Sequence, residues 1–329
     1  MPSFISFSLL LVTVSALAVP PASRAVDTTL VARLSEIPPG TTAVAVWVPL
    51  PRETSAQTIQ DLEIDSPFAW QRRTEREFGN QYLFARIDSP RSGMELLRLR
   101  FRAMRREITF DGITPTALSA AERQRNIRAE RLMTISPRVH RLAEAITRDA
   151  TGTLAQARAI YAYVLATMKY DKTMPGWGRG DTERACDIRA GNCTDFHSLF
   201  ISLARAKRIP ARFIIGFPVT NGSIPTTGYH CWAEFYLPGT GWVPVDPSEA
   251  SKSDDPLRRA YLFGNLDADR IEFTRGRDLR VSPPTRQPLN FFIYPYIEAN
   301  GEELESAAVT LSYRVLEAPF GGQVSGSLR

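Results

Sequence analysis

Cysteine and histidine are scarce in this sequence. Its 329 residues include three cysteines, at positions 186, 193 and 231, and three histidines. Three cysteines are too few for a fold held together mainly by disulfides, and an odd number leaves at least one thiol unpaired or bonded to another molecule. If Cys193 stays reduced, Cys186 and Cys231 remain as a possible pair, and a disulfide between them is a hypothesis.

Long hydrophobic runs are also scarce. Residues 4–19 form the one unbroken stretch of apolar and hydroxyl side chains, and it ends in Ala16-Leu17-Ala18 before two prolines. This arrangement is typical of a secretory signal peptide, and the run is short for a membrane-spanning helix. We therefore expect residues 1–18 to be a signal peptide that is cleaved. The remaining protein is expected to be exported to the periplasm or the cell exterior, with no stable membrane span.

Charge of one sign is nowhere concentrated. The net charge is +5, but the sequence contains no run of five like charges and no nucleic-acid-binding motif, which argues against a nucleic-acid partner. Several arginines, at positions 98, 100 and 102, alternate with apolar residues, as on the solvent-facing side of a strand. The length and the 43% hydrophobic content suffice for two domains, or for one large domain with extensions.

The pattern of strands and helices divides the chain into parts. We expect an N-terminal antiparallel β-sandwich at 27–110, a polar and partly helical connector at 111–135, an α+β core at 136–250 and a C-terminal extension with strands at 251–329. Helix start signals occur at Ser136-Pro137 and near Thr153. Strands are expected at 43–48, 81–87, 97–103, 212–217, 229–236, 242–245, 270–274, 291–296 and 309–315, and residues 169–192 are expected to be a loop.

Three segments of the core carry residues that suit covalent catalysis. Cys193 begins an apolar helix, His230 begins a later strand, and Asp246 ends another. A thiol at a helix N-terminus is stabilised as a thiolate by unpaired N–H groups and by a nearby imidazolium. Asp246 could hold the second ring nitrogen of His230 and fix its tautomer. The segments read Gly191-Asn192-Cys193-Thr194-Asp195, Tyr229-His230-Cys231-Trp232 and Trp242-Val243-Pro244-Val245-Asp246.

These residues predict acyl transfer through a thioester. Cys193 would attack an amide carbonyl, and its backbone N–H at the helix start would stabilise the oxyanion. His230 would protonate the leaving amine and then activate the water or amine that releases the acyl group.

In these three segments the sequence resembles the transglutaminase-like superfamily, a branch of the papain-like thiol enzymes. The resemblance covers roughly residues 136–250, and the chain is most similar to the bacterial exported subgroup, whose members carry an N-terminal β-domain. It implies an α+β papain-like core, in which a buried cysteine helix packs on an antiparallel sheet that bears His230 and Asp246. It also implies a protein, peptide or peptide-like substrate, in this case in the cell envelope. No calcium loop is evident in the sequence, so we expect no cofactor or metal.

The resemblance leaves the reaction open, because such proteins include cross-linking enzymes, deamidases, peptidases and amidases. Trp177, Asn192 and Trp232 are the candidates for a second oxyanion donor or for lining the cleft. One alternative is a structural metal site made from Cys193, His197 and neighbouring ligands, and another is a binding module without catalysis on the same fold.

Overall fold

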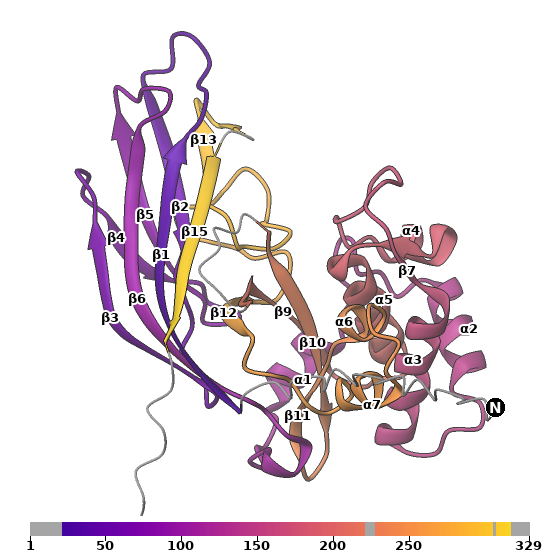
Figure 1. Ribbon diagram of the computed structural model, residues 1–329. Coiled ribbons are helices and arrows are strands. Elements are labelled where there is room, and N and C mark those ends of the chain that lie inside the picture. Colours follow the sequence, from indigo (N-terminus) through magenta and orange to yellow (C-terminus); the bar gives the residue numbers. More distant parts are fainter. Residues whose placement is uncertain (1–21, 221–227, 305–306, 317–329) are drawn as a thin grey trace, which may run out of the picture.

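The computed structural model describes residues 22–220, 228–304 and 307–316. The signal peptide expected at 1–18 lies outside the described residues. Figure 1 shows two bodies side by side, a β-sandwich and a second sheet that is covered by helices on the side away from the sandwich.

The sandwich consists of two antiparallel sheets. One has the strand order β15 (Ala307–Leu316), β1 (Ser23–Leu34), β6 (Glu95–Arg106) and β3 (Gln57–Asp65). The other has the order β14 (Glu302–Glu303), β13 (Tyr296–Ala299), β2 (Ala43–Pro49), β5 (Gln81–Asp88) and β4 (Gln71–Thr74).

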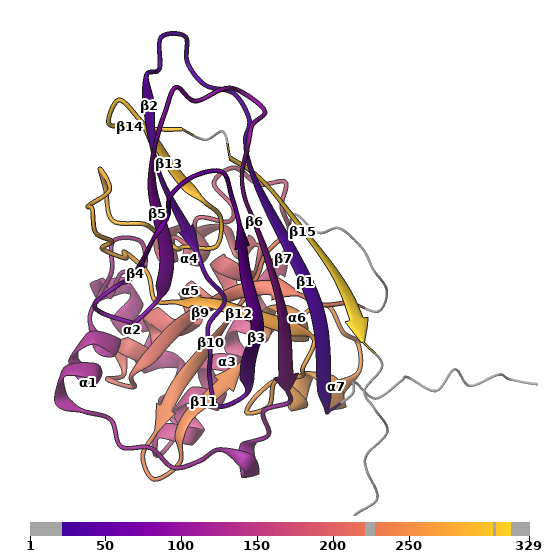
Figure 2. The same ribbon diagram turned by 90° about the vertical axis from the view of Figure 1, so that its left-hand side faces the viewer.

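The alternation expected at 97–103 is confirmed in β6. Leu97, Leu99 and Phe101 are buried, while Arg98 and Arg100 point to the wetter face of the sheet. An antiparallel strand buries every second side chain, so this pattern is the one a half-solvated strand requires. Figure 2 shows β6 between β1 and β3, with β2, β5 and β4 of the second sheet to the left of this layer.

The C-terminal strands complete this sandwich. The sequence pattern treated 251–329 as a separate extension, but β15 pairs with β1 from Ala25–Leu316 to Leu34–Ala307, and β13 pairs with β2. In addition, the strand expected at 291–296 is irregular chain, and β13 begins only at Tyr296. Local patterns locate a strand but do not encode which distant edge it joins, so the division by sequence order differs from the division in space.

The second body is built on an antiparallel sheet with the order β11 (Gly241–Val245), β10 (His230–Leu237), β9 (Ala211–Pro218) and β12 (Arg270–Arg275). Helix α5 (Cys193–Ala206) packs on β10 and β9 and is buried along its whole length. The helices α2 (Pro137–Ile146), α3 (Thr153–Thr167) and α4 (Thr182–Ile188) surround α5 on its other sides. Because β12 lies in this sheet, the core extends past residue 250.

One segment holds more structure than its sequence suggested, and the connector holds a helix as expected. The loop expected at 169–192 contains α4 between the short parallel strands β7 (Lys169–Tyr170) and β8 (Ala190–Gly191). The side chain of Asp181 caps α4 by accepting from the N–H groups of Glu183 and Arg184. In the connector, α1 (Ala120–Ile127) begins with a capping box of Ser119 and Glu122. A helix as short as α4 spans too few turns to show a clear apolar periodicity, and the glycines of the same segment favour a loop.

The two bodies share one continuous apolar core. Phe273 of β12 joins them, because its ring lies 6.2 Å from that of Phe101 in β6 and 5.1 Å from that of Phe217 in β9. Among the helices in the described residues, none has the length and apolar character to cross a membrane.

Candidate active site around Cys193

Cys193 is the first residue of α5, and polar neighbours fix this helix start. Asn192 caps the helix by accepting from the N–H of Thr194, and Asp195 accepts from the N–H of Asn192 at 3.0 Å. The approach of Asp195 requires a glycine at 191, because a Cβ there would lie 2.1 Å from the carboxylate. The motif residues Gly191, Asn192 and Asp195 therefore fix the backbone conformation at Cys193.

Asp195 also ties a neighbouring loop to this helix start. Its carboxylate accepts from the N–H of Gly178 at 2.8 Å and from that of Gly180 at 3.1 Å. Burial raises the pKa of Asp195 even though these N–H groups favour the charged form. The loop that carries Trp177 is in this way held beside the nucleophile.

The three residues singled out by the sequence lie together. The Nε2 atom of His230 lies 2.7 Å from Oδ2 of Asp246, and the imidazole of His230 is hydrogen-bonded to the Cys193 side chain. Since Nε2 is occupied by Asp246, Nδ1 is the ring nitrogen that serves the thiol. The order of groups is thiol, imidazole and carboxylate, brought from α5, β10 and the end of β11.

The charges of this array favour a thiolate and an imidazolium. Burial raises the pKa of the Cys193 thiol, but hydrogen bonds from Cys231 and His230 and the charge of His230 outweigh it and hold that pKa well below its ordinary value. Burial disfavours the His230 cation, yet Asp246 and Cys193 raise its pKa to about 10. At neutral pH the pair is therefore ionised, which is the state that a thiol nucleophile needs.

Asp246 is bonded on both carboxylate oxygens. It caps the short helix α6 (Pro247–Ala250), where Oδ1 accepts from the N–H of Glu249 at 3.0 Å and from Oγ of Ser248 at 3.1 Å. Oδ2 accepts from His230 and, at 2.8 Å, from Nη1 of Arg270. Burial raises the pKa of Asp246, but its cationic and hydrogen-bonding neighbours hold it well below its ordinary value.

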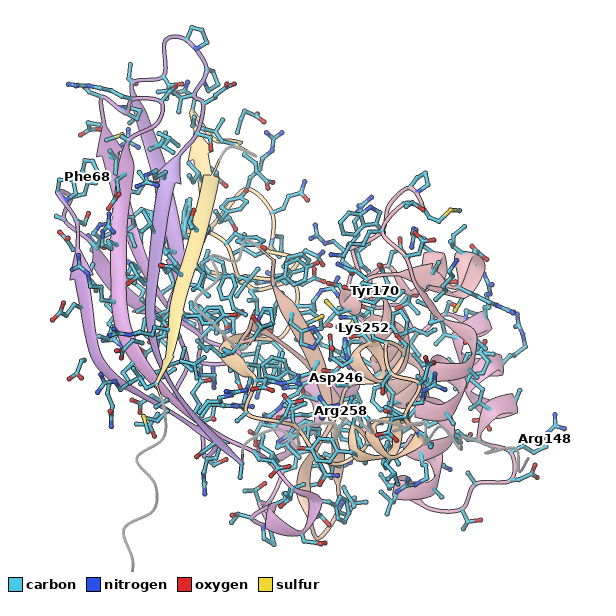
Figure 3. All side chains as sticks on the ribbon, in the orientation of Figure 1. Phe68, Arg148, Tyr170, Asp246, Lys252 and Arg258 are labelled. Atoms are coloured by element: carbon cyan, nitrogen blue, oxygen red, sulfur yellow. The ribbon has the colours of Figure 1, made fainter. Side chains whose placement is uncertain are left out.

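Arg270 is a member of the site that the sequence analysis did not find. It lies on β12, and Asp267 holds its guanidinium through Nε at 3.2 Å and Nη2 at 2.9 Å. Asp267 in turn pairs with Arg258 of α7 (Pro256–Tyr261), which is labelled in Figure 3. Positive and negative side chains therefore alternate along one connected series, which consists of Arg258, Asp267, Arg270, Asp246 and His230. Only the tertiary pairing of β12 with β9 brings Arg270 there.

His197 links the helix start to the carboxylate. Its Nδ1 lies 2.6 Å from the carbonyl oxygen of Cys193, so Nδ1 carries the proton and donates it, since a carbonyl only accepts. Its Nε2 lies 3.4 Å from Oδ1 of Asp246. The imidazole rings of His197 and His230 meet edge to face at 6.4 Å. The sequence analysis considered His197 as a metal ligand beside Cys193, and the structure shows its contact with Asp246.

Glu249 and Lys252 form one rim of the site. An oxygen of Glu249 lies 3.7 Å from Nδ1 of His230 and 2.5 Å from Nζ of Lys252. That Nζ lies 4.4 Å from the ring centre of Tyr170, and Figure 3 shows Lys252 and Tyr170 next to each other. Charged and aromatic groups therefore border the histidine.

The thiol is buried, and tyrosines lie near it. The hydroxyl of Tyr229 accepts from Nδ2 of Asn192 at 2.9 Å and lies 2.9 Å from Oγ1 of Thr194. Burial, and after it the Cys193 charge, raises the pKa of Tyr294 to about 12. Cys193 itself is 1% exposed. Electrostatic interactions with the thiolate are strong in such a setting.

The three additional candidates have different environments. Trp177 is 39% exposed on the loop held by Asp195, with Nζ of Lys172 5.7 Å from its ring centre. Asn192 uses both ends of its amide, one for the helix cap and one for Tyr229. Trp232 is fully buried with Ile214 and Leu266, and its ring stacks against that of His230 at 6.4 Å between centroids.

The cysteines are unbonded in the structure. The disulfide hypothesised between Cys186 and Cys231 is wrong here, because Cys186 lies in α4 among Arg138, Glu183 and Asp187, whereas Cys231 contacts the start of α5. The metal-site alternative also lacks its ligand set: in the described residues, no three His, Cys, Asp or Glu side chains are grouped so that they could hold an ion.

Comparison with known proteins identifies the kind of domain that contains this site. Residues 140–247 match the family model of the transglutaminase-like superfamily, so the chain carries a transglutaminase-like domain. The crystal structure of a candidate cysteine protease from Cytophaga hutchinsonii has a TM-score of 0.59 at 15% identity, covering 91% of this chain and 92% of that chain. At this identity the likeness shows the fold alone; together with the family match it confirms the expected α+β transglutaminase-like core.

Two relatives are found by sequence. An uncharacterized protein of Haemophilus influenzae is 28% identical over 302 residues, which is 79% of this chain and 82% of that protein. The uncharacterized protein YebA of Bacillus subtilis is 27% identical over 128 residues, 34% of this chain and 17% of that protein. The first match extends well beyond the transglutaminase-like domain and includes most of the sandwich.

Proposed function

We propose that this protein is a thiol-dependent acyltransferase or amide hydrolase that works through a thioester on Cys193. The observation that carries the proposal is the continuous chain of contacts from the Cys193 thiol through His230 to Asp246. The transglutaminase-like domain and the cysteine-protease-like fold support the same chemistry.

The first half of the reaction forms the thioester. The Cys193 thiolate attacks the carbonyl carbon of an amide, and negative charge develops on the carbonyl oxygen. The backbone N–H of Cys193, the first of α5, has no partner within the helix and would stabilise that charge. The tetrahedral intermediate then collapses as His230 gives its proton to the leaving amine.

The second half releases the acyl group. Neutral His230 takes a proton from water or from a second amine, which attacks the thioester and restores the Cys193 thiolate. Asp246 holds Nε2 of His230 throughout, so that Nδ1 stays directed at the reacting groups. Water as the acceptor gives hydrolysis, and an amine gives cross-linking or transfer.

We place this activity in the cell envelope, on a protein, peptide or peptide-like substrate. The support is the secretory character of residues 4–19. The rim of Tyr170, Lys252 and Glu249 offers an acceptor or donor both aromatic and charged surfaces beside His230.

Trapping of the acyl group tests the proposal. The purified protein is mixed with a cell-envelope extract and quenched in acid, and the Cys193 peptide is examined by mass spectrometry. We expect an acyl adduct on Cys193 in the wild type and none in His230→Ala, with the Cys186 peptide as an internal control. Adducts spread equally over both cysteines, or none on Cys193, would contradict thioester chemistry at this site.

A further inference from the structure

Cys231 follows His230 directly on β10 and lies against the start of the nucleophile helix. Its side chain is fully buried. Its Sγ lies 3.6 Å from Nδ1 of His197 and 3.8 Å from Oγ1 of Thr194. Both partners are among the first five residues of α5, the helix that Cys193 begins.

The two thiols share a hydrogen bond. Burial raises the pKa of Cys231, and its bond to the Cys193 thiolate raises it further, so Cys231 keeps its proton at neutral pH. The same bond helps to keep Cys193 ionised against the effect of burial. A protonated thiol is therefore directed at a thiolate inside the site.

This arrangement matters when the nucleophile meets an oxidant. A thiolate is the form of cysteine that peroxides attack, and the resulting sulfenic acid either condenses with a nearby thiol or is oxidised further and irreversibly. Of the two remaining cysteines, Cys231 lies against the helix start that carries Cys193, with its Sγ 3.6 Å from Nδ1 of His197, whereas Cys186 lies on α4 among other charged groups.

We propose that Cys231 is the resolving thiol of Cys193, so that oxidation by a peroxide joins the two in a disulfide. The thiolate attacks one oxygen of hydrogen peroxide, the O–O bond breaks, and with one proton the products are Cys193 sulfenic acid and water. The Cys231 sulfur then attacks the Cys193 sulfur. The S–S bond forms, the S–O bond breaks, and the leaving hydroxide takes the Cys231 proton as water.

The disulfide would inactivate the site reversibly. It removes the nucleophile, and it also protects the Cys193 sulfur from sulfinic acid formation. A small-molecule thiol reductant returns both cysteines to their starting state. The inference rests on the proposed function only in requiring a reactive thiolate at Cys193.

Peptide mapping after peroxide treatment tests the proposal on the full chain. We expect the wild type to lose two hydrogens, to give a linked peptide pair containing Cys193 and Cys231, and to lose iodoacetamide labelling at Cys193 until dithiothreitol is added. Cys186→Ser is the matched control and should behave like the wild type.

Substitution of the resolving thiol gives the opposite result. In Cys231→Ser and Cys231→Ala, peroxide should add two oxygens to Cys193, and dithiothreitol should no longer restore labelling. If the wild type gives sulfinic acid as fast as these variants and no linked peptide forms, the proposal is overturned. The mapping needs no substrate, so a linked pair still supports the inference if thioester trapping fails.

Discussion

At the scale of single residues, the site depends on how its carboxylate is bonded. Asp246 receives Arg270 and His230 on one oxygen and the cap of α6 on the other, so its plane has one orientation. Asp267 holds the far side of Arg270, and its own pKa is lowered to about 2 by Arg270 and Arg258 despite burial. The pKa of Asp246 is likewise held well below its ordinary value, so the negative charge of Asp246 beside His230 is present over the whole physiological pH range.

Replacement of Asp246 tests this orientation. Asp246→Asn can still accept the helix-cap bond, but its amide group would present a donor to His230 and would favour the wrong tautomer. We expect turnover of the substrate found by trapping to fall roughly 10²- to 10⁴-fold, with the free energy of unfolding changed less. Ser248→Ala removes one bond to Asp246 without removing its charge and should keep most of the activity. Equal turnover in both variants would argue against an orienting carboxylate.

The pH dependence of Cys193 alkylation tests the ion pair. Because His230 holds the pKa of Cys193 low, the wild type should react with iodoacetamide at pH 6 and show little increase up to pH 9. In His230→Ala the cation is gone and burial dominates, so the rate should rise only as the pH approaches or exceeds the ordinary thiol pKa. At pH 6 each unit of increase in pKa lowers the thiolate fraction about tenfold. A profile unchanged by the substitution would exclude the pair.

At the scale of elements, the beginning of α5 combines capping with chemistry. Asn192 satisfies an N–H group of the first turn and at the same time binds the hydroxyl of Tyr229. Asp195 lies so close to Gly191 that any side chain at position 191 would collide with its carboxylate. The turn that presents the thiol is thus fixed by residues whose first effect is on helix stability.

Two cap substitutions separate these effects. Asn192→Ala and Ser119→Ala each remove a helix cap, and each should cost about 1 kcal/mol of unfolding free energy in urea titrations. Only Asn192→Ala should also slow the alkylation of Cys193, because α1 is remote from the thiol. A slower reaction in Ser119→Ala as well would mean that general loosening, and not the helix start, controls the thiol.

How much of the structure the sequence could predict depends on how far apart in the chain the interacting residues lie. The starts of α2 and α5 and the strands β9 and β10 have local signals, namely caps, prolines and periodic apolar residues. Cys193, His230 and Asp246 could be grouped because their motifs are short. The role of Arg270 and the burial of Trp232 depend on the pairing of β12 and on the sandwich beyond it, for which the local sequence holds no signal.

At the scale of the whole molecule, both ends of the described chain meet in one sheet. Strand β15 covers the edge of β1 along ten paired positions and buries Val309, Leu311 and Tyr313. The hydroxyl of Tyr313 also accepts from the N–H of Thr220, next to the end of β9. The C-terminal strand thereby contacts both bodies.

A core substitution in β15 measures this contribution. Leu311→Ala should lower the free energy of unfolding by about 2–5 kcal/mol, because Leu311 is fully buried between the sheets. Ser312→Ala, the next residue and an exposed one, should change it by less than about 0.5 kcal/mol. Thermal unfolding compares the two, and similar values would show that β15 adds little to the sandwich.

The pairing of β1 with β15 also sets an order of events during synthesis. Ala25 emerges from the ribosome long before its partner Leu316, so the first strand must wait with one edge unpaired. The hairpin-connected strands β9 to β11 have no such delay and can form while the chain is still growing. The candidate catalytic sheet can therefore begin to assemble before the sandwich closes, and chaperone binding to the nascent chain should concentrate on residues 23–34.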